Sequence, residues 1–234
     1  MLNEVETILF DIDGTLVDSN DPHALAWVDA LAEGGFDVPF TKIRPFIGMG
    51  GDKLVPALDL GLTEEEEPGT SIVANRKKIF LERYVGDVRP FPGARELVAA
   101  CRERGLRRIV ASSSSPEELT PLLKIAGIEN LFDHAMSPNE VKETKPDPDI
   151  IAAALAWSGS EPGQTVMIGD TRYDAEAAAR AGVRMVALRS GGSPEDDLRA
   201  ATAIYDDPAA LVAALRDSTF DDLLPRPGQA RSRT

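Results

Sequence analysis

Short runs of apolar residues recur along the chain, and most of them are followed by a stretch with helical spacing. Within the runs the apolar residues are continuous rather than alternating with polar ones, as in IVA, VMIG and VRMVAL. Continuous apolar runs are typical of parallel strands that are covered on both faces. The pattern therefore predicts five buried strands, at residues 5–10, 108–111, 132–136, 165–169 and 183–188.

Proline and glycine mark the stretches between these runs as helices. Pro116 and Pro148 stand where two helices should begin, and Gly105, Gly127 and Gly182 stand where three should end. Proline is tolerated in the first turn of a helix, and glycine commonly follows the last turn. These signals predict helices at 94–103, 116–126, 148–157 and 173–181. Such alternation of strands and helices predicts an α/β fold with a doubly wound, Rossmann-like parallel sheet.

A long segment near the N-terminus interrupts the alternation. Residues 18–89 carry helix-like patterns, at 22–33, 51–58 and 71–84, and no clear pair of strands. This excursion is longer than an ordinary crossover between two parallel strands, so it is interpreted as an inserted α-helical cap domain. We therefore expect a catalytic core of residues 1–17 and 90–220, a cap domain of 18–89, and a flexible, Pro- and Arg-rich tail of 221–234.

Composition and charge narrow the range of partners. The chain has 234 residues with 39 acidic and 25 basic side chains, for a formal net charge of −14. Such a charge disfavours binding to nucleic acid or to an anionic membrane. The single cysteine, Cys101, excludes an internal disulfide. Neither a signal peptide nor a run of ~20 apolar residues is found, so a cytoplasmic protein is expected, as a monomer or homodimer.

Two aspartates follow the first predicted strand, in the sequence DIDGTLVDS. Asp11 and Asp13 are two residues apart, so they point to the same side if the chain stays extended. Ligands of open parallel sheets bind outside the carboxyl ends of the strands, where this pair lies. Carboxylates this close need a cation or a shared proton, and one can stay ionised while the other is poised as an acid. An Asp-Gly turn that simply closes a strand is the structural alternative.

Groups that suit phosphate follow two other strands. Serines at 112 to 115 separate the second strand from Pro116, and their hydroxyls and free backbone N–H groups suit an anion. The alternative for these serines is a polar cap for the next helix. Lys145 precedes another helix that proline marks, where it can bind phosphate as a point charge or remain a solvated surface charge.

A second acidic pair follows the fourth strand. Asp170 comes directly after that strand, and Asp174 lies in the first turn of the next helix. The helix dipole alone would favour an acid at position 174, so Asp174 also has a structural explanation. Carboxylates from two strand ends, completed by waters and a substrate phosphate, form the coordination that Mg²⁺ prefers.

Taken together in their order and spacing, these motifs resemble those of the haloacid dehalogenase-like hydrolases. The resemblance is to phosphatases with an inserted helical cap, such as phosphoglycolate phosphatase and β-phosphoglucomutase. It covers about residues 5–215 and includes DIDGTLVDS, Ser112, Lys145 with Pro146, and GDTRYD. The combination of DxDGT with a later GDxxxD is the specific part of the match.

The resemblance implies roles for the core residues. Asp11 would be the nucleophile that forms an aspartyl-phosphate, and Asp13 would be the general acid and base. An aspartate at position 13 favours phosphate ester chemistry over dehalogenation in this family. The phosphoryl group would be held by Ser112, Ser113 and Lys145. The family's Mg²⁺ would be bound by Asp11, the main-chain carbonyl of Asp13, and Asp170, with Asp174 behind them or in contact through water.

In the cap, His23 resembles the hinge histidine of the β-phosphoglucomutase-like branch, and residues 44–54 resemble a substrate-specificity loop. Arg44 or Lys53 would meet a second anionic group, and Gly50 would allow close approach of the backbone. The structural alternatives are a polar residue on the first cap helix and a glycine-rich linker. The expected function is a Mg²⁺-dependent phosphatase acting on a small phosphorylated metabolite, phosphoglycolate-like or a sugar phosphate. A phosphomutase of the β-phosphoglucomutase type and a non-catalytic phosphate-binding protein are the alternatives.

Overall fold

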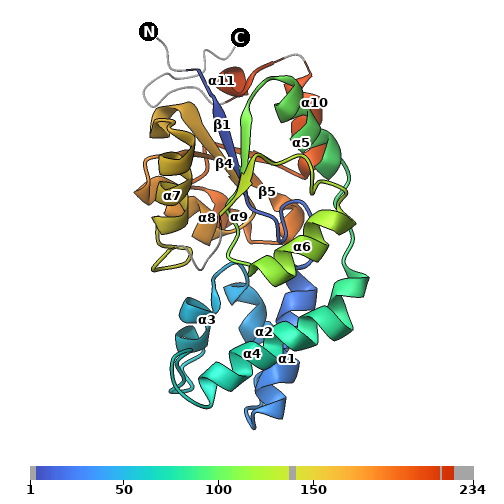
Figure 1. Cartoon of the computed structure of the whole chain (residues 1–234), viewed down its shortest axis with the longest axis vertical. Coiled ribbons are helices and arrows are strands. Elements are labelled where there is room, and N and C mark those ends of the chain that lie inside the picture. Colours follow the sequence, from blue (N-terminus) through green and yellow to red (C-terminus); the bar gives the residue numbers. More distant parts are fainter. Residues whose placement is uncertain (1–3, 137–140, 217, 224–234) are drawn as a thin grey trace.

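The protein consists of a sheet with helices on both sides and a helical insert that projects from one end of it (Figure 1). The structure is a computed structural model that describes residues 4–136, 141–216 and 218–223. Helix α11 (Phe220–Leu223) lies at the pole opposite the helical insert. The sequence-based prediction of an α/β fold with an inserted helical segment is confirmed.

Six parallel strands form the sheet in the order β3-β2-β1-β4-β5-β6. Phe10, the last residue of β1, is aligned with Val110 of β2 and with Ile168 of β4. Because the three central strands end almost level, the residues that follow them meet at one edge of the sheet. The strands are β1 (Thr7–Phe10), β2 (Arg107–Val110), β3 (His134–Ala135), β4 (Thr165–Gly169), β5 (Arg184–Leu188) and β6 (Ala203–Tyr205).

Buried side chains on both faces of the sheet explain the continuous apolar runs. Ile8 and Phe10 of β1 belong to one cluster, and Leu9 between them belongs to a second cluster. The first cluster includes side chains of α5 (Ala94–Glu103), α6 (Pro116–Ile125) and α10 (Pro208–Leu215). The second includes those of α7 (Asp149–Ser158), α8 (Arg172–Arg180) and α9 (Glu195–Leu198).

The helical insert comprises α1 (Asn20–Glu33), α2 (Phe40–Ile43), α3 (Gly51–Ala57) and α4 (Gly69–Ile79). Helices α1 and α4 pack along each other, and α4 continues into a π-helical turn at Phe80–Tyr84. The chain enters and leaves the insert side by side, since the backbone N–H of Asp18 donates to the carbonyl of Arg89 at 2.8 Å. The insert is therefore joined to the sheet at one narrow place.

Predicted and observed elements differ mainly where elements are short. Of the third strand, predicted at 132–136, only His134–Ala135 pairs with the sheet. Strand β6 and helices α9 and α10 were not predicted. Part of the predicted tail lies in the short helix α11 (Phe220–Leu223), and the rest of that prediction, 224–234, lies outside the described residues.

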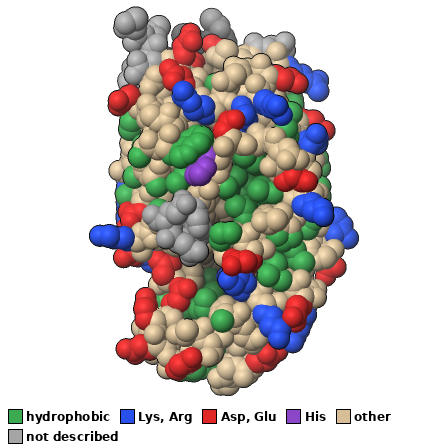
Figure 2. All heavy atoms as spheres, viewed as in Figure 1, with side chains coloured by type: hydrophobic (Ala, Val, Ile, Leu, Met, Phe, Trp, Pro, Cys, Tyr) green, Lys and Arg blue, Asp and Glu red, His purple; other side chains and the backbone are tan. Residues whose placement is uncertain are grey.

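The surface carries charges of both signs. On the face drawn in Figure 2, Lys and Arg side chains are interspersed with Asp and Glu side chains over both parts of the molecule. Within the described ranges, no helix combines the length and apolar character needed to cross a membrane.

Candidate active site

A tight turn after β1 places the first two aspartates at the edge of the sheet. The backbone N–H of Asp11 still donates to the carbonyl of Ile168 (2.9 Å), and the N–H groups of residues 15–17 then all point to the carbonyl of Ile12. Gly14 has a φ of 75°, and a Cβ at this position would lie 2.3 Å from Oδ2 of Asp170. The turn therefore requires glycine both for its conformation and for its closeness to Asp170.

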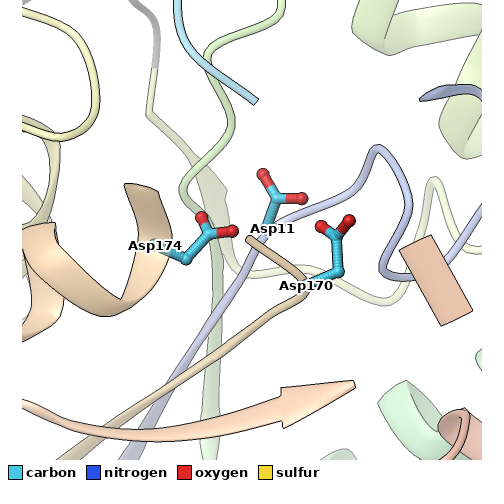
Figure 3. A group of neighbouring side chains, drawn as sticks. All are labelled: Asp11, Asp170 and Asp174. Carbon is cyan, nitrogen blue, oxygen red and sulfur yellow. The ribbon is translucent and has the colours of Figure 1, made fainter. Parts of the chain in front are cut away.

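Three buried carboxylates gather at this edge (Figure 3). Asp11 follows β1, Asp170 follows β4, and Asp174 lies in the first turn of α8. One oxygen of each lies within 4.8 Å of the others. Burial raises the pKa of Asp11 to about 7, although the nearby charge of Lys145 opposes the shift. Burial and the charges of Asp11 and Asp174 also raise the pKa of Asp170 well above its ordinary value.

One buried cation, Lys145, lies among these carboxylates. Its Nζ donates to Oδ1 of Asp11 at 2.5 Å and to Oδ1 of Asp174 at 2.7 Å, and the side chain is 1% exposed. Although burial disfavours the charged ammonium, the carboxylates of Asp11 and Asp174 raise the pKa of Lys145. The other oxygen of Asp174 accepts hydrogen bonds from the backbone N–H (3.1 Å) and the hydroxyl (2.6 Å) of Thr171. Both oxygens of Asp174 are thus already engaged.

The charge balance of this group fits a divalent cation. Three carboxylates, from Asp11, Asp170 and Asp174, face one ammonium group, so two negative charges remain uncompensated when all are ionised. Buried charges in proteins are normally paired or bind a metal ion. Carboxylate oxygens are hard ligands, and Mg²⁺ is bound in proteins by one or two carboxylates together with waters and substrate phosphate.

Asp13 has a very different environment from Asp11. Its Oδ1 accepts hydrogen bonds from Ser19 Oγ (2.5 Å) and His23 Nε2 (2.9 Å). Its Oδ2 accepts one from Ser114 Oγ at 2.6 Å and lies 3.5 Å from Ser112 Oγ. Burial alone would raise the pKa of Asp13, but the charge of His23 and these hydrogen bonds lower it well below its ordinary value. The pKa values of the two neighbouring carboxyls are thus shifted in opposite directions, and Asp11 is the weaker acid of the two.

His23 connects the helical insert to the sheet edge where the aspartates gather. It lies on α1, is 5% exposed, and its ring stacks on Phe80 with the centroids 3.8 Å apart. Its Nδ1 lies 3.4 Å from Nη1 of Arg76, which also forms an ion pair with the buried Glu118 of α6. The insert therefore supplies the ring that contacts Asp13.

A cavity of about 50 Å³ lies between the sheet edge and the insert. Core residues that line it are Asp11, Asp13 and Ser112–Ser114, and the insert contributes His23, Trp27, residues 47–51 and Arg76. Ser113, which was predicted to bind phosphate, donates through its hydroxyl to the carbonyl of Gly48 at 3.4 Å. Lys145 is not among the residues that line the cavity, but its Nζ donates to the carboxylate of Asp11, which does line it.

Of the predicted loop 44–54, residues 47–51 line this cavity, and His23 lines it as well. Arg44 instead donates to Asp21 Oδ1 and to the carbonyl of Gly191, both at 2.6 Å. Lys53 pairs with Glu143 and, at 3.0 Å, with Asp147. These contacts differ from the expectation that Arg44 or Lys53 meets a second anionic group, because Arg44 binds the insert residue Asp21 and a core carbonyl, and Lys53 binds two core carboxylates.

Several site residues were missed by reasoning from the sequence. Within the described part of the chain, Arg76 is the basic residue that lines the cavity. A charged residue on an amphipathic helix looks like part of a solvated face, so the sequence carries no signal for it. Ser114 lies within the serine run already noted. Ser19 is the last residue of the DIDGTLVDS motif and Asn20 directly follows it, which is the signal that could have found them.

Comparisons with known proteins support the same class of enzyme. A family model described as "haloacid dehalogenase-like hydrolase" matches residues 5–182. A phosphoglycolate phosphatase of Nitrosococcus oceani is 31% identical over 206 residues, covering 85% of this chain and 90% of that protein. The crystal structure of a hydrolase from Pseudomonas syringae superposes with a TM-score of 0.84 and 29% identity, covering 92% of this chain and 99% of the other.

A plant protein, SUPPRESSOR OF QUENCHING 1 of Arabidopsis thaliana, is 33% identical over 193 residues. The match covers 80% of this chain but only 18% of the plant protein's length.

The fold and the site define an α/β protein in which a helical insert and the acidic edge of a parallel sheet enclose a small cavity. More specifically, the chain belongs to the haloacid dehalogenase-like hydrolase family, in the branch of phosphoglycolate phosphatase and β-phosphoglucomutase-like proteins. Within this family it is a phosphatase.

Proposed function

We propose that this phosphatase requires Mg²⁺ and hydrolyses a small phosphate monoester through an aspartyl-phosphate formed on Asp11. The observation that carries the proposal is the position of Asp11. Its carboxylate faces the cavity, receives a 2.5 Å hydrogen bond from the buried Lys145, and belongs to a group of three buried carboxylates.

The metal ligands in this proposal are Asp11, Asp170 and the main-chain carbonyl of Asp13. Bound Mg²⁺ would neutralise negative charge on the phosphoryl oxygens and on the carboxylates as the reaction proceeds. Asp174 binds Lys145 through one oxygen and Thr171 through the other, and its proposed role is to hold Lys145 beside Asp11.

In the chemical steps, an oxygen of Asp11 attacks phosphorus and the bond to the leaving oxygen breaks. The leaving oxygen takes its proton from Asp13, and Asp13 then removes a proton from the water that hydrolyses the aspartyl-phosphate. A phosphate anion beside Asp13 raises the pKa of that carboxyl, which allows it to carry the proton at the first step. Lys145, Ser112 and Ser113 hold the phosphoryl oxygens.

The size of the cavity supports a small substrate. It measures about 50 Å³ with the insert against the sheet edge, which leaves little room beyond a phosphate and a few further atoms. The relative from Nitrosococcus oceani is named phosphoglycolate phosphatase, so phosphoglycolate is the first substrate to test. Arg76 is positioned to face the part of the substrate beyond the phosphate.

The proposal is tested by replacing Asp11 with Asn and measuring phosphate release from phosphoglycolate and from a panel of sugar phosphates. Because the amide is a poor nucleophile of nearly equal shape, turnover should fall by at least ~10³-fold with the fold intact. Wild-type turnover should also stop when EDTA is added and return with excess Mg²⁺. Near-normal turnover by Asp11→Asn would refute the mechanism. Isomerisation of β-glucose 1-phosphate faster than phosphate release would show a mutase instead.

A further inference from the structure

Asn20 is a buried polar residue to which the proposed chemistry gives no role. It is the first residue of α1 and is 1% exposed. Its Nδ2 donates to Oδ2 of Asp170 at 3.0 Å and to the carbonyl of Gly191 at 3.1 Å. The side chain of a residue that begins the helical insert thus contacts a carboxylate that belongs to the core.

Asp170 is enclosed so closely that few orientations are open to its carboxylate. Oδ1 accepts a hydrogen bond from Thr15 Oγ1 at 3.0 Å, and Oδ2 accepts the one from Asn20. A Cβ would lie 2.3 Å from Oδ2 if added to Gly14 and 1.6 Å from Oδ2 if added to Gly191. The backbone of two glycines therefore surrounds Oδ2, and Asn20 supplies its hydrogen-bond donor.

The other end of the Asn20 amide has no partner. Oδ1 is buried and forms no hydrogen bond with any of the residues that the structure describes. Turning the amide over would place Oδ1 against a carboxylate oxygen and a carbonyl oxygen, which are both acceptors. A buried oxygen without a donor is destabilising, and such groups in native proteins call for an explanation. The donor contact with Asp170 supplies that explanation.

Helix capping does not explain Asn20. The N-cap residue of α1 is Ser19, and no side-chain hydrogen bond caps this helix. The Ser19 hydroxyl donates to Asp13 instead (2.5 Å). Both residues at the start of α1 therefore direct their side chains to aspartates of the catalytic edge rather than to the helix backbone.

The carbonyl of Gly191 receives a second hydrogen bond from the insert, from Arg44 Nη2 at 2.6 Å. Gly191 packs directly on Asp170, so the start of α1 and the segment after α2 converge on the same neighbour of this carboxylate.

We propose that Asn20 is a positioning residue that holds Asp170 in the orientation needed to bind Mg²⁺. The inference rests on the proposed function, because it takes Asp170 to be a metal ligand. Removing a hydrogen-bond partner of a metal ligand typically weakens metal affinity 10- to 100-fold. Asn20 also links the insert to the metal site, since it is the first residue of α1 and its side-chain amide contacts Asp170.

The test measures Mg²⁺ binding directly, by isothermal titration calorimetry of the metal-free protein. Asn20→Ala should raise the Kd for Mg²⁺ by ~10-fold or more. Asn20→Leu keeps the branched shape and the number of side-chain heavy atoms and removes both the donor and the unpaired oxygen, so it should fold and show the same weakening. The matched control is Asn75→Ala, because Asn75 Nδ2 also donates to a carboxylate, Glu33 at 2.8 Å, but on the exposed face of the insert.

A second readout separates positioning from a purely structural role. At saturating Mg²⁺, kcat of both Asn20 variants should return to within ~3-fold of the wild-type value, since the defect lies in metal affinity. Wild-type Kd values for Mg²⁺ in both variants would overturn the inference, as would a loss of kcat that excess Mg²⁺ does not restore. Failure of the wild-type protein to bind Mg²⁺ would instead overturn the proposed function, so the two failures are distinguishable.

Discussion

Asp11 and Asp13 are two residues apart, yet their surroundings shift the two carboxyl groups in opposite directions. Burial raises the pKa of Asp11 to about 7, although the charge of Lys145 opposes the shift, and the charge of Asp174 adds to it. Asp13 receives hydrogen bonds from His23, Ser19 and Ser114, so its pKa is lowered. A bound Mg²⁺ beside Asp11 would keep that group ionised as a nucleophile, which is the condition that its chemistry requires. The two pKa shifts thus follow from the surroundings of each carboxyl rather than from residue type, and the proposed roles require Mg²⁺ and substrate phosphate to reverse them.

Cys101 allows a prediction at the same scale. Its thiol is fully buried on α5, and burial raises its pKa to about 12. Since the thiolate is the reactive form, about one thiol in 10⁴ would be ionised at pH 8. The native protein should therefore react very slowly with iodoacetamide at pH 8, and unfolding in guanidinium chloride should release one rapidly reacting thiol. Rapid labelling of the native protein, followed by mass spectrometry, would contradict the buried position of this residue.

Among the elements, those with clear boundary signals were predictable. Helix α5 and strand β4 occupy the predicted residues, since a buried apolar pattern and a following glycine or acid fix their ends. Strand β6 has three residues and is only half-buried, so it lacks the apolar run that revealed the other strands. Helix α9 has four residues, too few to show a helical period. Short elements of this kind are stabilised by packing against longer neighbours, and a local sequence pattern does not reveal that packing.

Glu118 joins two elements and makes a further prediction possible. One of its oxygens accepts hydrogen bonds from the N–H and hydroxyl of Ser115 at the start of α6 (3.4 and 2.9 Å), and the other pairs with Arg76 of α4. Glu118→Ala removes a capping partner and leaves a partly buried guanidinium unpaired. The free energy of unfolding in urea should fall by about 3 kcal/mol.

A neighbouring glutamate provides the control for this experiment. Glu117 is 61% exposed and pairs with Lys77 at 3.5 Å on the surface, so Glu117→Ala should change the free energy of unfolding much less than Glu118→Ala does. Equal losses of unfolding free energy for the two variants would show that the contact between Glu118 and Arg76 does not stabilise the packing of α4 against α6.

At the scale of the whole molecule, the edge of the sheet was predictable but the inner surface of the insert was not. The carboxyl ends of parallel strands lie together in any doubly wound fold, so Asp11, Asp170 and Ser112 could be placed near one another from the sequence. Which insert residues face them depends on how α1 and α4 pack and rotate over the edge. Arg44 and Arg76 are both basic residues of the insert, and only the packing decides that Arg76 lines the cavity.

The charge distribution of the whole molecule predicts a specific effect of Mg²⁺ on stability. The chain has a net charge of −14, so any cation should stabilise it slightly by screening self-repulsion. Mg²⁺ should do more, because the group of Asp11, Asp170 and Asp174 with Lys145 has two uncompensated negative charges when all three carboxyls are ionised, and a bound cation favours that state. At a hundredfold excess over its Kd, Mg²⁺ should stabilise the folded state by about 2.7 kcal/mol, or raise Tm by about 5–10 °C, relative to NaCl at equal ionic strength.

Asp170→Asn should lose most of this increase, and its metal-free form should melt at or above the wild-type Tm, because one buried charge has been removed. An equal increase in both proteins would mean that Mg²⁺ acts on the surface charge alone.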